Sequence, residues 1–265
     1  MWKTREGGFF QSRNHFFLAF SKMSPQLKIV QISDVHLGAG ADRTQRELYL
    51  LNFRRVWKAA LVEKPDAIVF SGDMTDHGTE EEIGLLKGEI EGAKPPLFFV
   101  SGNHDDSARL CSALSLPSEK GKLVYRFSLG GVEHFVLDSS TNRVDSCQLD
   151  WLEREAGKVK GPCALWIHHP PTLCGSLFMD TKWPLLDREP VMERIKSIPA
   201  IRHVFCGHYH SGKTVERDGI FFHLAPATQF QISDDEPEFA IASSDPGYQT
   251  VEWRGEDVEV SLRFV

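Results

Sequence analysis

Several short apolar runs of this chain stop abruptly at Asp, Asn or His, in most cases beside a glycine. This repeated ending constrains the fold more than any other feature, because the parallel strands of an α/β protein place such residues together at one edge of a sheet. One ending of this kind occurs by chance in many proteins, whereas a succession of them does not. The endings are Asp34-Val35-His36, Gly72-Asp73, Gly102-Asn103-His104-Asp105, His168-His169 and Gly207-His208-Tyr209-His210.

The first half of the chain alternates between strand-like and helix-like patterns. Residues 27–33, 67–70 and 97–100 are short apolar runs, the pattern of buried strands. Residues 45–63 and 80–91 lie between them, and the first of these has apolar residues at three- and four-residue spacing, which is typical of a helix with one buried face. This order predicts parallel strands joined by crossover helices.

The second half adds more strands than helices. Gly130-Gly131 between two apolar runs predicts a hairpin. We expect strands at 123–129, 132–137, 164–167, 203–206, 214–217, 220–224, 249–253 and 258–264, and helices at 147–156 and 191–196. Because no Pro/Gly/Ser-rich linker divides the chain, we expect a single domain over 25–265 with two sheets and helices outside them. Residues 1–24 are expected to be a disordered leader, and Met23 is an alternative start to Met1.

Composition excludes several classes of function. The chain has 30 basic and 37 acidic residues, a net charge of −7, which argues against nucleic-acid polymers and anionic membranes as partners because both attract basic surfaces. No apolar run approaches the ~18 residues that cross a bilayer. The five cysteines are odd in number and form no C-x-x-C pair, so we expect a reducing compartment, the cytoplasm.

The spacing within the strand endings suits a pair of metal ions. Asp-x-His and His-x-His place two side chains on the same side of extended chain, so together they supply most of a first site. An Asn carbonyl, two further His and a shared carboxylate complete a second site, and Asp73 is the candidate bridge. Nitrogen and oxygen ligands without thiolate favour Mn, Fe, Co, Ni or Zn over Ca and Mg. Two such ions lower the pKa of a bound water to ~7 and leave a small positive charge suited to a phosphate ester.

The strand endings resemble those of the calcineurin-like metallophosphoesterase superfamily, whose motifs are D-x-H, GD, GNHD, H and GHxH. The resemblance spans about residues 27–253. Within the superfamily the chain is most similar to the bacterial class III cyclic-nucleotide (3′,5′-cAMP) phosphodiesterase and glycerophosphodiesterase group. That narrower resemblance depends on Gly72-Asp73-Met74-Thr75-Asp76-His77-Gly78, His168-His169-Pro170-Pro171, Met179-Asp180, Ala225-Pro226-Ala227-Thr228 and Pro246-Gly247-Tyr248.

The resemblance implies a role for each site residue. His104 would act as a catalytic residue beside the phosphate, stabilising charge or protonating the leaving oxygen, and Asp105 would orient it. The implied metal ligands are Asp34, His36 and His210 for one ion, Asn103, His168 and His208 for the other, and Asp73 as the bridge.

Two assignments near these ligands stay open. The family's H-x-P pattern favours His168 over His169 as the ligand, and His169 would then support a ligand or face the substrate. Asp76 and His77 could shape the site in the same way, or they could cap a helix that begins near Thr79.

The implied fold is α/β, a four-layer α/β/β/α sandwich in which two mixed β-sheets are flanked by helices. The implied reaction is attack of metal-bound hydroxide on a small-molecule phosphodiester such as 3′,5′-cAMP, with two divalent metal ions as cofactors. A glycerophosphodiesterase or broad-specificity phosphomonoesterase is the alternative enzyme, and a non-catalytic metal-binding interaction module is the alternative of another class. The apolar loop 172–188 is expected to be a lid or a homodimer contact.

Overall fold

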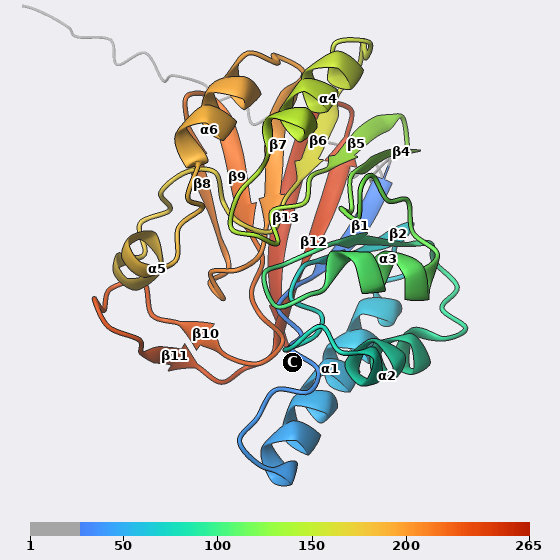
Figure 1. Cartoon of the computed structure of the whole chain (residues 1–265), viewed down its shortest axis with the longest axis vertical. Helices are drawn as coiled ribbons and strands as arrows, with labels where there is room; N and C mark the ends of the chain where they lie inside the picture. The colour runs from blue at the N-terminus through green and yellow to red at the C-terminus, as the bar shows by residue number, and fades with distance from the viewer. Residues whose placement is uncertain (1–26) are drawn as a thin grey trace, which may run out of the picture.

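The computed structural model describes residues 27–265, so the predicted leader at 1–24 and the choice between Met1 and Met23 lie outside the described residues. Figure 1 shows the arrangement of the helices and strands. In chain order they are β1 (Leu27–Ile32), α1 (Arg43–Val62), β2 (Ala67–Ser71), α2 (Glu80–Ile90), β3 (Leu97–Val100), α3 (Ser107–Leu114), β4 (Tyr125–Leu129), β5 (Val132–Val136), α4 (Ser146–Ala156), β6 (Cys163–Trp166), α5 (Leu177–Lys182), α6 (Arg188–Lys196), β7 (Ile201–Cys206), β8 (Lys213–Arg217), β9 (Ile220–Leu224), β10 (Gln231–Ile232), β11 (Ile241–Ser243), β12 (Gly247–Arg254) and β13 (Asp257–Phe264).

The first sheet joins the beginning and the end of the described chain. Its strand order is β13-β12-β1-β2-β3. Strands β1, β2 and β3 are parallel, as the crossover helices predict, whereas β12 pairs antiparallel with β1 and β13. The carboxyl ends of the parallel strands therefore lie at one edge, and Asp34, Asp73 and Asn103 follow directly after them.

The second sheet has the order β4-β5-β6-β7-β9-β8. Strands β5, β6, β7 and β9 are parallel, while β4 and β8 pair antiparallel with their hairpin partners. The hairpin predicted at Gly130-Gly131 joins β4 to β5. His168 follows β6 and His208 follows β7, so this sheet also ends in predicted site residues.

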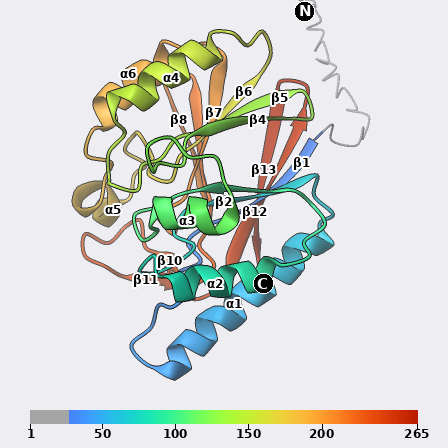
Figure 2. The same ribbon diagram turned by 45° about the vertical axis from the view of Figure 1, so that its right-hand side comes forward.

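The two sheets pack face to face, and helices cover their outer sides. Helices α1, α2 and α3 lie on one side of the molecule, and α4 and α6 lie on the other (Figure 1 and Figure 2). Buried side chains of both sheets, such as Val69 of β2 and Trp166 of β6, form a core between them. Two further cores lie beneath the helices. The predicted α/β/β/α sandwich with two mixed sheets is confirmed.

Three features were not predicted from the sequence: α3, α5 and the small sheet of β10 and β11. Helix α5 has 6 residues and β10 has 2, which is too short for a periodic pattern to be recognised. Helix α5 lies inside the loop predicted at 172–188, so that loop is partly helical. Within residues 27–265, no helix is long and apolar enough to span a membrane.

Candidate metal centre

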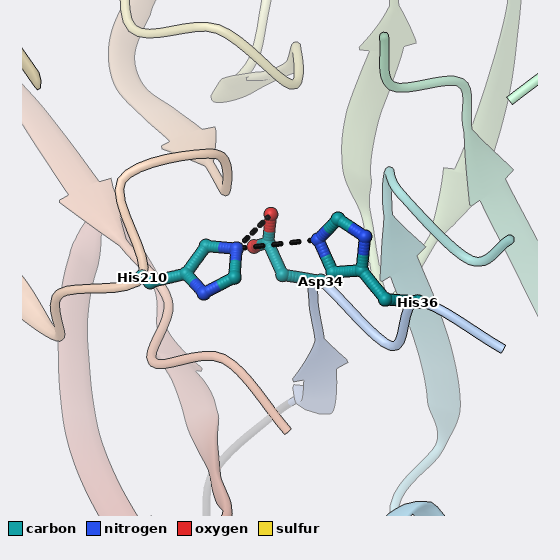
Figure 3. Close-up of side chains that lie close together, drawn as sticks. All are labelled: Asp34, His36 and His210. Carbon is teal, nitrogen blue, oxygen red and sulfur yellow. Dashed lines mark hydrogen bonds and ion pairs between the residues drawn. The ribbon is translucent and has the colours of Figure 1, made fainter. Parts of the chain in front are cut away.

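The first group of predicted ligands comes from the end of β1 and the turn after β7. The ligand atoms of Asp34, His36 and His210 all lie within 4.8 Å of one another, and Figure 3 shows the three side chains pointing together. Asp34 is fully buried, and its carboxylate accepts the backbone N–H of His208 at 3.1 Å. Burial disfavours its charge, but His210 and His168 outweigh burial and lower the pKa of Asp34 to about 2. The carboxylate is therefore ionised.

The second group consists of Asp73, His168 and His208, whose ligand atoms also lie within 4.8 Å of one another. His168 is fully buried, and its Nδ1 lies 2.8 Å from the Ser71 carbonyl at the end of β2. Nδ1 must therefore carry a proton, which leaves Nε2 to face the group. Burial opposes the charge on His168, but the Asp73 carboxylate outweighs it and raises the pKa of His168 to about 9.

Asp73, a member of the second group, also lies close to the first. Its Oδ2 is 3.2 Å from His168 Nε2 and 3.8 Å from His36 Nε2. Its Oδ1 accepts the backbone N–H of His104 at 2.9 Å. A carboxylate in this position can contact a cation in each group, which is the geometry that the bridging role requires.

The residues present fit two divalent cations. Among the described residues, Asn103 Oδ1 and His168 Nε2 are buried without a hydrogen-bond partner, and a buried polar atom without a partner is costly. A cation would satisfy both atoms. His208 Nε2 lies 2.9 Å from the carbonyl of Trp183, which leaves its Nδ1 free to act as a ligand. We call Asp34, His36, Asp73, Asn103, His168, His208 and His210 the ligand cluster.

The geometry of the two side chains bears on the open choice between His168 and His169. His168 belongs to the second group, whereas His169 lies behind it with Nδ1 2.8 Å from Ser139 Oγ. The two rings meet edge to face, and the His169 ring lies 4.1 Å from that of His208. Burial holds the pKa of His169 well below its usual value. His169 therefore supports the ligand rings as a neutral, buried side chain.

The partner of His104 is Asp76, and the prediction that Asp105 orients His104 is corrected. His104 Nδ1 lies 2.9 Å from the backbone carbonyl of Asp76 and 3.5 Å from its Oδ1. The same carboxylate lies 3.1 Å from Nδ1 of His36. The contact with Asp76 raises the pKa of His104 to about 9. Asp76 thus orients both a candidate ligand and the candidate catalytic histidine.

Asp105 instead joins two loops to each other. Its carboxylate accepts hydrogen bonds from the backbone N–H groups of Gly102 and Thr75, both at 3.0 Å, and from Thr75 Oγ1 at 2.8 Å. Burial and the nearby Asp73 raise the pKa of Asp105 to about 6. The sequence placed Asp105 next to His104 in the chain, but its side chain turns back toward the end of β2.

His77 lies outside the ligand cluster. Its side chain is 66% exposed, and Nδ1 lies 3.1 Å from Glu82 Oε1. Helix α2 is capped by Thr79, whose side chain accepts the N–H of Glu82 while Glu82 accepts the N–H of Thr79. Neither Asp76 nor His77 is the cap, and of the two only Asp76 contacts the ligand cluster.

The glycines of two motifs are required by close contacts with ligand side chains. A Cβ atom on Gly72 would overlap the ring of His168, and one on Gly102 would overlap the carboxylate of Asp73. Glycine at these positions therefore lets the turns after β2 and β3 approach side chains of the cluster. This close approach explains why a glycine precedes Asp73 and another precedes Asn103.

The backbone at the cluster is strained. Five of its members have left-handed φ angles between 47° and 67°, a region that residues other than glycine adopt uncommonly and that Asn, Asp and His adopt most often among them. They are Asp34, His36, Asp73, His208 and His210. Such strain persists only where the surrounding structure enforces it, and it is concentrated at functional sites.

A cavity of about 450 Å³ opens above the cluster. Its polar residues are His36, Asp73, Asp76, Asn103, His104, His208 and His210. The rest of its lining is largely apolar and includes Phe178, Met179 and Trp183 from the loop predicted at 172–188. This loop, expected to be a lid or a homodimer contact, thus contributes side chains to the cavity.

Comparison with known proteins agrees with this geometry. The family model for calcineurin-like phosphoesterases matches residues 27–212. A probable cyclic nucleotide phosphodiesterase of Fibrobacter succinogenes is 34% identical over 241 residues, covering 90% of this chain and 94% of the relative. A 3′,5′-cyclic adenosine monophosphate phosphodiesterase of Vibrio vulnificus is 26% identical over 232 residues, covering 84% of each chain.

Solved structures share the fold. A dimetal phosphatase from Danio rerio superposes with a TM-score of 0.63 at 16% identity, covering 91% of this chain and 96% of the other. The match to the family model extends over more than half of the chain and contains every member of the ligand cluster. The chain belongs to the calcineurin-like phosphoesterase family.

Proposed function

We propose that this phosphoric ester hydrolase is a phosphodiesterase of cyclic nucleotides such as 3′,5′-cAMP. The observation that carries the proposal is the meeting of two ligand groups on either side of Asp73. The Fibrobacter relative, a probable cyclic nucleotide phosphodiesterase by name, supports this substrate class.

The ligand cluster would hold two divalent ions, with Mn, Fe, Zn, Co and Ni as candidates. Asp34, His36 and His210 would bind one ion, and the other would be bound by Asn103, His168 and His208, with Asp73 between them. When bound, the ions would supply positive charge for the phosphate and activate water.

His104 would supply a proton to the leaving oxygen. The Asp76 carbonyl accepts the proton on its Nδ1 at 2.9 Å, so Nε2 is the nitrogen available to the substrate. His104 lines the cavity, and its side chain is 41% exposed. With Nδ1 held by Asp76, a protonated imidazole could donate its Nε2 proton to the leaving oxygen as a general acid. Asp76 acts through His104 and His36 as a positioning residue.

Glycerophosphodiesters are the second candidate substrate class. A probable glycerophosphodiester phosphodiesterase of Arcobacter nitrofigilis is 25% identical over 225 residues. Phosphomonoesters use the same kind of metal centre, so a substrate panel of cyclic nucleotides, glycerophosphodiesters and monoesters distinguishes the three classes by their kcat/KM.

The first test is metal-dependent hydrolysis of bis-p-nitrophenyl phosphate. We expect turnover with Mn²⁺, complete loss of turnover after EDTA treatment and dialysis, and recovery when a divalent ion is restored. Failure of every divalent ion to support turnover would contradict the proposal and favour the non-catalytic metal-binding module. Bound metal measured by elemental analysis should equal two ions per chain.

The cellular location, the domain organisation and the partners of the enzyme stay predictions. We infer a cytoplasmic protein with a single domain over 25–265 that acts on a small molecule and binds neither nucleic-acid polymers nor membranes. The loop 172–188 would act either as a lid over the cavity or as a homodimer contact, and the molar mass in solution tests the second role.

A further inference from the structure

The cavity above the ligand cluster has an aromatic and aliphatic side that the proposed chemistry does not use. Two separate segments build it: the region of α5 and the residues around β10 and β11. We call this side the aromatic wall, and its members are Phe178, Met179, Trp183, Phe230, Ile232 and Phe239. Trp183 is 56% exposed and Phe239 is 53% exposed, so ring surface is available for a ligand to cover.

The aromatic wall is attached to the ligand cluster through its backbone. His208 Nε2 lies 2.9 Å from the carbonyl of Trp183, and His210 Nδ1 lies 3.2 Å from the carbonyl of Phe230. Each candidate ligand is thus oriented by a residue whose own side chain lines the cavity. Tyr209, between the two histidines, donates its hydroxyl to Asp180 of α5 at 2.8 Å. These contacts therefore fix the position of the wall relative to the ligand cluster, where the phosphate would bind.

The two segments of the wall also contact each other. The backbone N–H of Leu177 donates to the carbonyl of Asp234 at 2.9 Å. The rings of Phe178 and Phe239 lie 5.9 Å apart, and those of Phe230 and Phe239 also lie 5.9 Å apart, both pairs edge to face. Edge-to-face packing of this kind holds rings in place, so the wall is a built surface.

The charge of the cavity limits what can lie along the wall. In the described part of the chain, no lysine or arginine lines the cavity. The carboxylate of Asp76 is already engaged by His36, and the Asp76 carbonyl by His104. A second phosphate or a carboxylate lying along the aromatic wall would meet no lysine or arginine, and an unpaired charge away from water is costly. The cavity suits one phosphodiester charge at the cluster and an uncharged ring system beside it.

We propose that the aromatic wall, with Trp183 and Phe239 as its exposed rings, stacks on the base of a cyclic nucleotide and so determines substrate selectivity. This inference rests on the proposed function and adds the residues that choose among phosphodiesters. Stacking suits the wall because every nucleobase presents a flat π-face and needs no charged partner.

The experiment compares 3′,5′-cAMP with ribose 3,5-cyclic phosphate, which has the same cyclic diester and no base. For the full-length protein loaded with Mn²⁺, we expect kcat/KM to be about tenfold or more higher for cAMP, the size of effect that stacking on an aromatic side chain gives. Trp183→Ala should bring the ratio of the two values close to one, and Phe239→Ala should lower it in the same direction.

Leu186→Ala is the matched control. Leu186 is 58% exposed, against 56% for Trp183, and it follows Trp183 closely in the chain without lining the cavity. This variant should keep the wild-type ratio. A loss of selectivity in Leu186→Ala equal to that in Trp183→Ala would overturn the role of the wall, because general disturbance of the segment would then explain both.

Three further results of the kinetic comparison would overturn the proposal. Equal kcat/KM for the two substrates in the wild-type protein overturns it, and so does a wild-type ratio in Trp183→Ala. A higher kcat/KM for glycerophosphocholine than for cAMP shows that a cationic group lies against the rings and also overturns it.

Failure of the proposed function gives a different result. If the wild-type protein hydrolyses neither cyclic phosphate, titration calorimetry with cAMP replaces turnover as the measurement. A Kd that rises about tenfold in Trp183→Ala supports the wall even then. An unchanged Kd, or no binding of cAMP to the wild-type protein, overturns it.

Discussion

The ligand cluster and the aromatic wall enclose one cavity but differ in physical character. The cluster is charged and buried, with contacts such as the 3.2 Å between His168 Nε2 and Asp73 Oδ2. The wall is apolar, and its rings Trp183 and Phe239 are more than half exposed. The cluster comes from the ends of parallel strands in the two main sheets, whereas the wall comes from the short helix α5 and from residues in and beside β10 and β11.

This difference separates the reaction from the choice of substrate. With its ions bound, the cluster would stabilise the charge of any phosphate ester, because the ions would interact with the phosphate and not with the organic part of the substrate. The wall can contact only the organic part of the substrate, so changes there should alter selectivity more than the reaction itself. Variants in the cluster should therefore lower kcat/KM for every substrate, whereas variants in the wall should change the ratio of kcat/KM between substrates.

The largest effect is expected for Asn103→Ala. This change removes the side-chain oxygen proposed as a ligand of the second ion, and hydrolysis of every substrate should fall by roughly 10³-fold or more, above the 10–100-fold typical of an outer partner. Steady-state kinetics and elemental analysis measure the effect. Asn103→Asp, which keeps an oxygen ligand, should retain two ions, and wild-type rates in Asn103→Ala would remove this residue from the cluster.

His104→Ala should have the next largest effect. Loss of a general acid slows turnover by about 10²–10⁴-fold, most strongly for substrates with poor leaving groups, while both ions stay bound. The control is His77→Ala, whose side chain is 66% exposed and contacts Glu82; it should turn over at the wild-type rate. Loss of metal from His104→Ala would show that His104 is a ligand.

Asp76→Asn and Asp105→Asn test the corrected partner of His104. Asp76 contacts His36 and His104, so Asp76→Asn should reduce metal affinity or turnover by about 10–100-fold with little change in stability. Asp105 accepts backbone N–H groups, so Asp105→Asn should instead lower the free energy of unfolding by about 1–3 kcal/mol. Urea denaturation and kinetics together distinguish the two, and the reverse pattern would restore the original assignment.

The smallest effect is expected for Tyr209→Phe, which acts on the attachment of the wall. The change removes the hydrogen bond from Tyr209 to Asp180, but Asp180 keeps the backbone N–H groups of Cys174 and Gly175. We expect a loss of about 0.5–1.5 kcal/mol in stability and a few-fold change in the ratio of kcat/KM between cAMP and its abasic analogue.

The control for Tyr209→Phe is Tyr248→Phe, because Tyr248 of β12 donates its hydroxyl to Glu63 at the end of α1 and neither residue lines the cavity. It should change stability without changing the ratio of kcat/KM. An equal shift of the ratio in both variants would show that the hydrogen bond from Tyr209 to Asp180 has no specific effect on selectivity.

The sequence by itself determined the fold class and the candidate ligands. Two pairs of candidate ligands are close in the chain, Asp34 with His36 and His208 with His210. The apolar runs before them indicate strands without any knowledge of distant contacts. Parallel strands then bring their ends to one edge for reasons of topology alone. The family resemblance rests on those same positions and is confirmed by the match over residues 27–212.

Only the tertiary structure decided which carboxylate serves His104 and what lines the cavity. Asp105 is adjacent to His104 in the chain, yet the φ angle of 49° at Asp73 and the loop after it place Asp76 against the histidine instead. Trp183 and Phe239 lie far apart in sequence, just outside α5 and β11, which are too short for a periodic signal. Their meeting depends on long-range contacts, such as Leu177 to Asp234 and Tyr209 to Asp180, and local sequence patterns carry no information about such contacts.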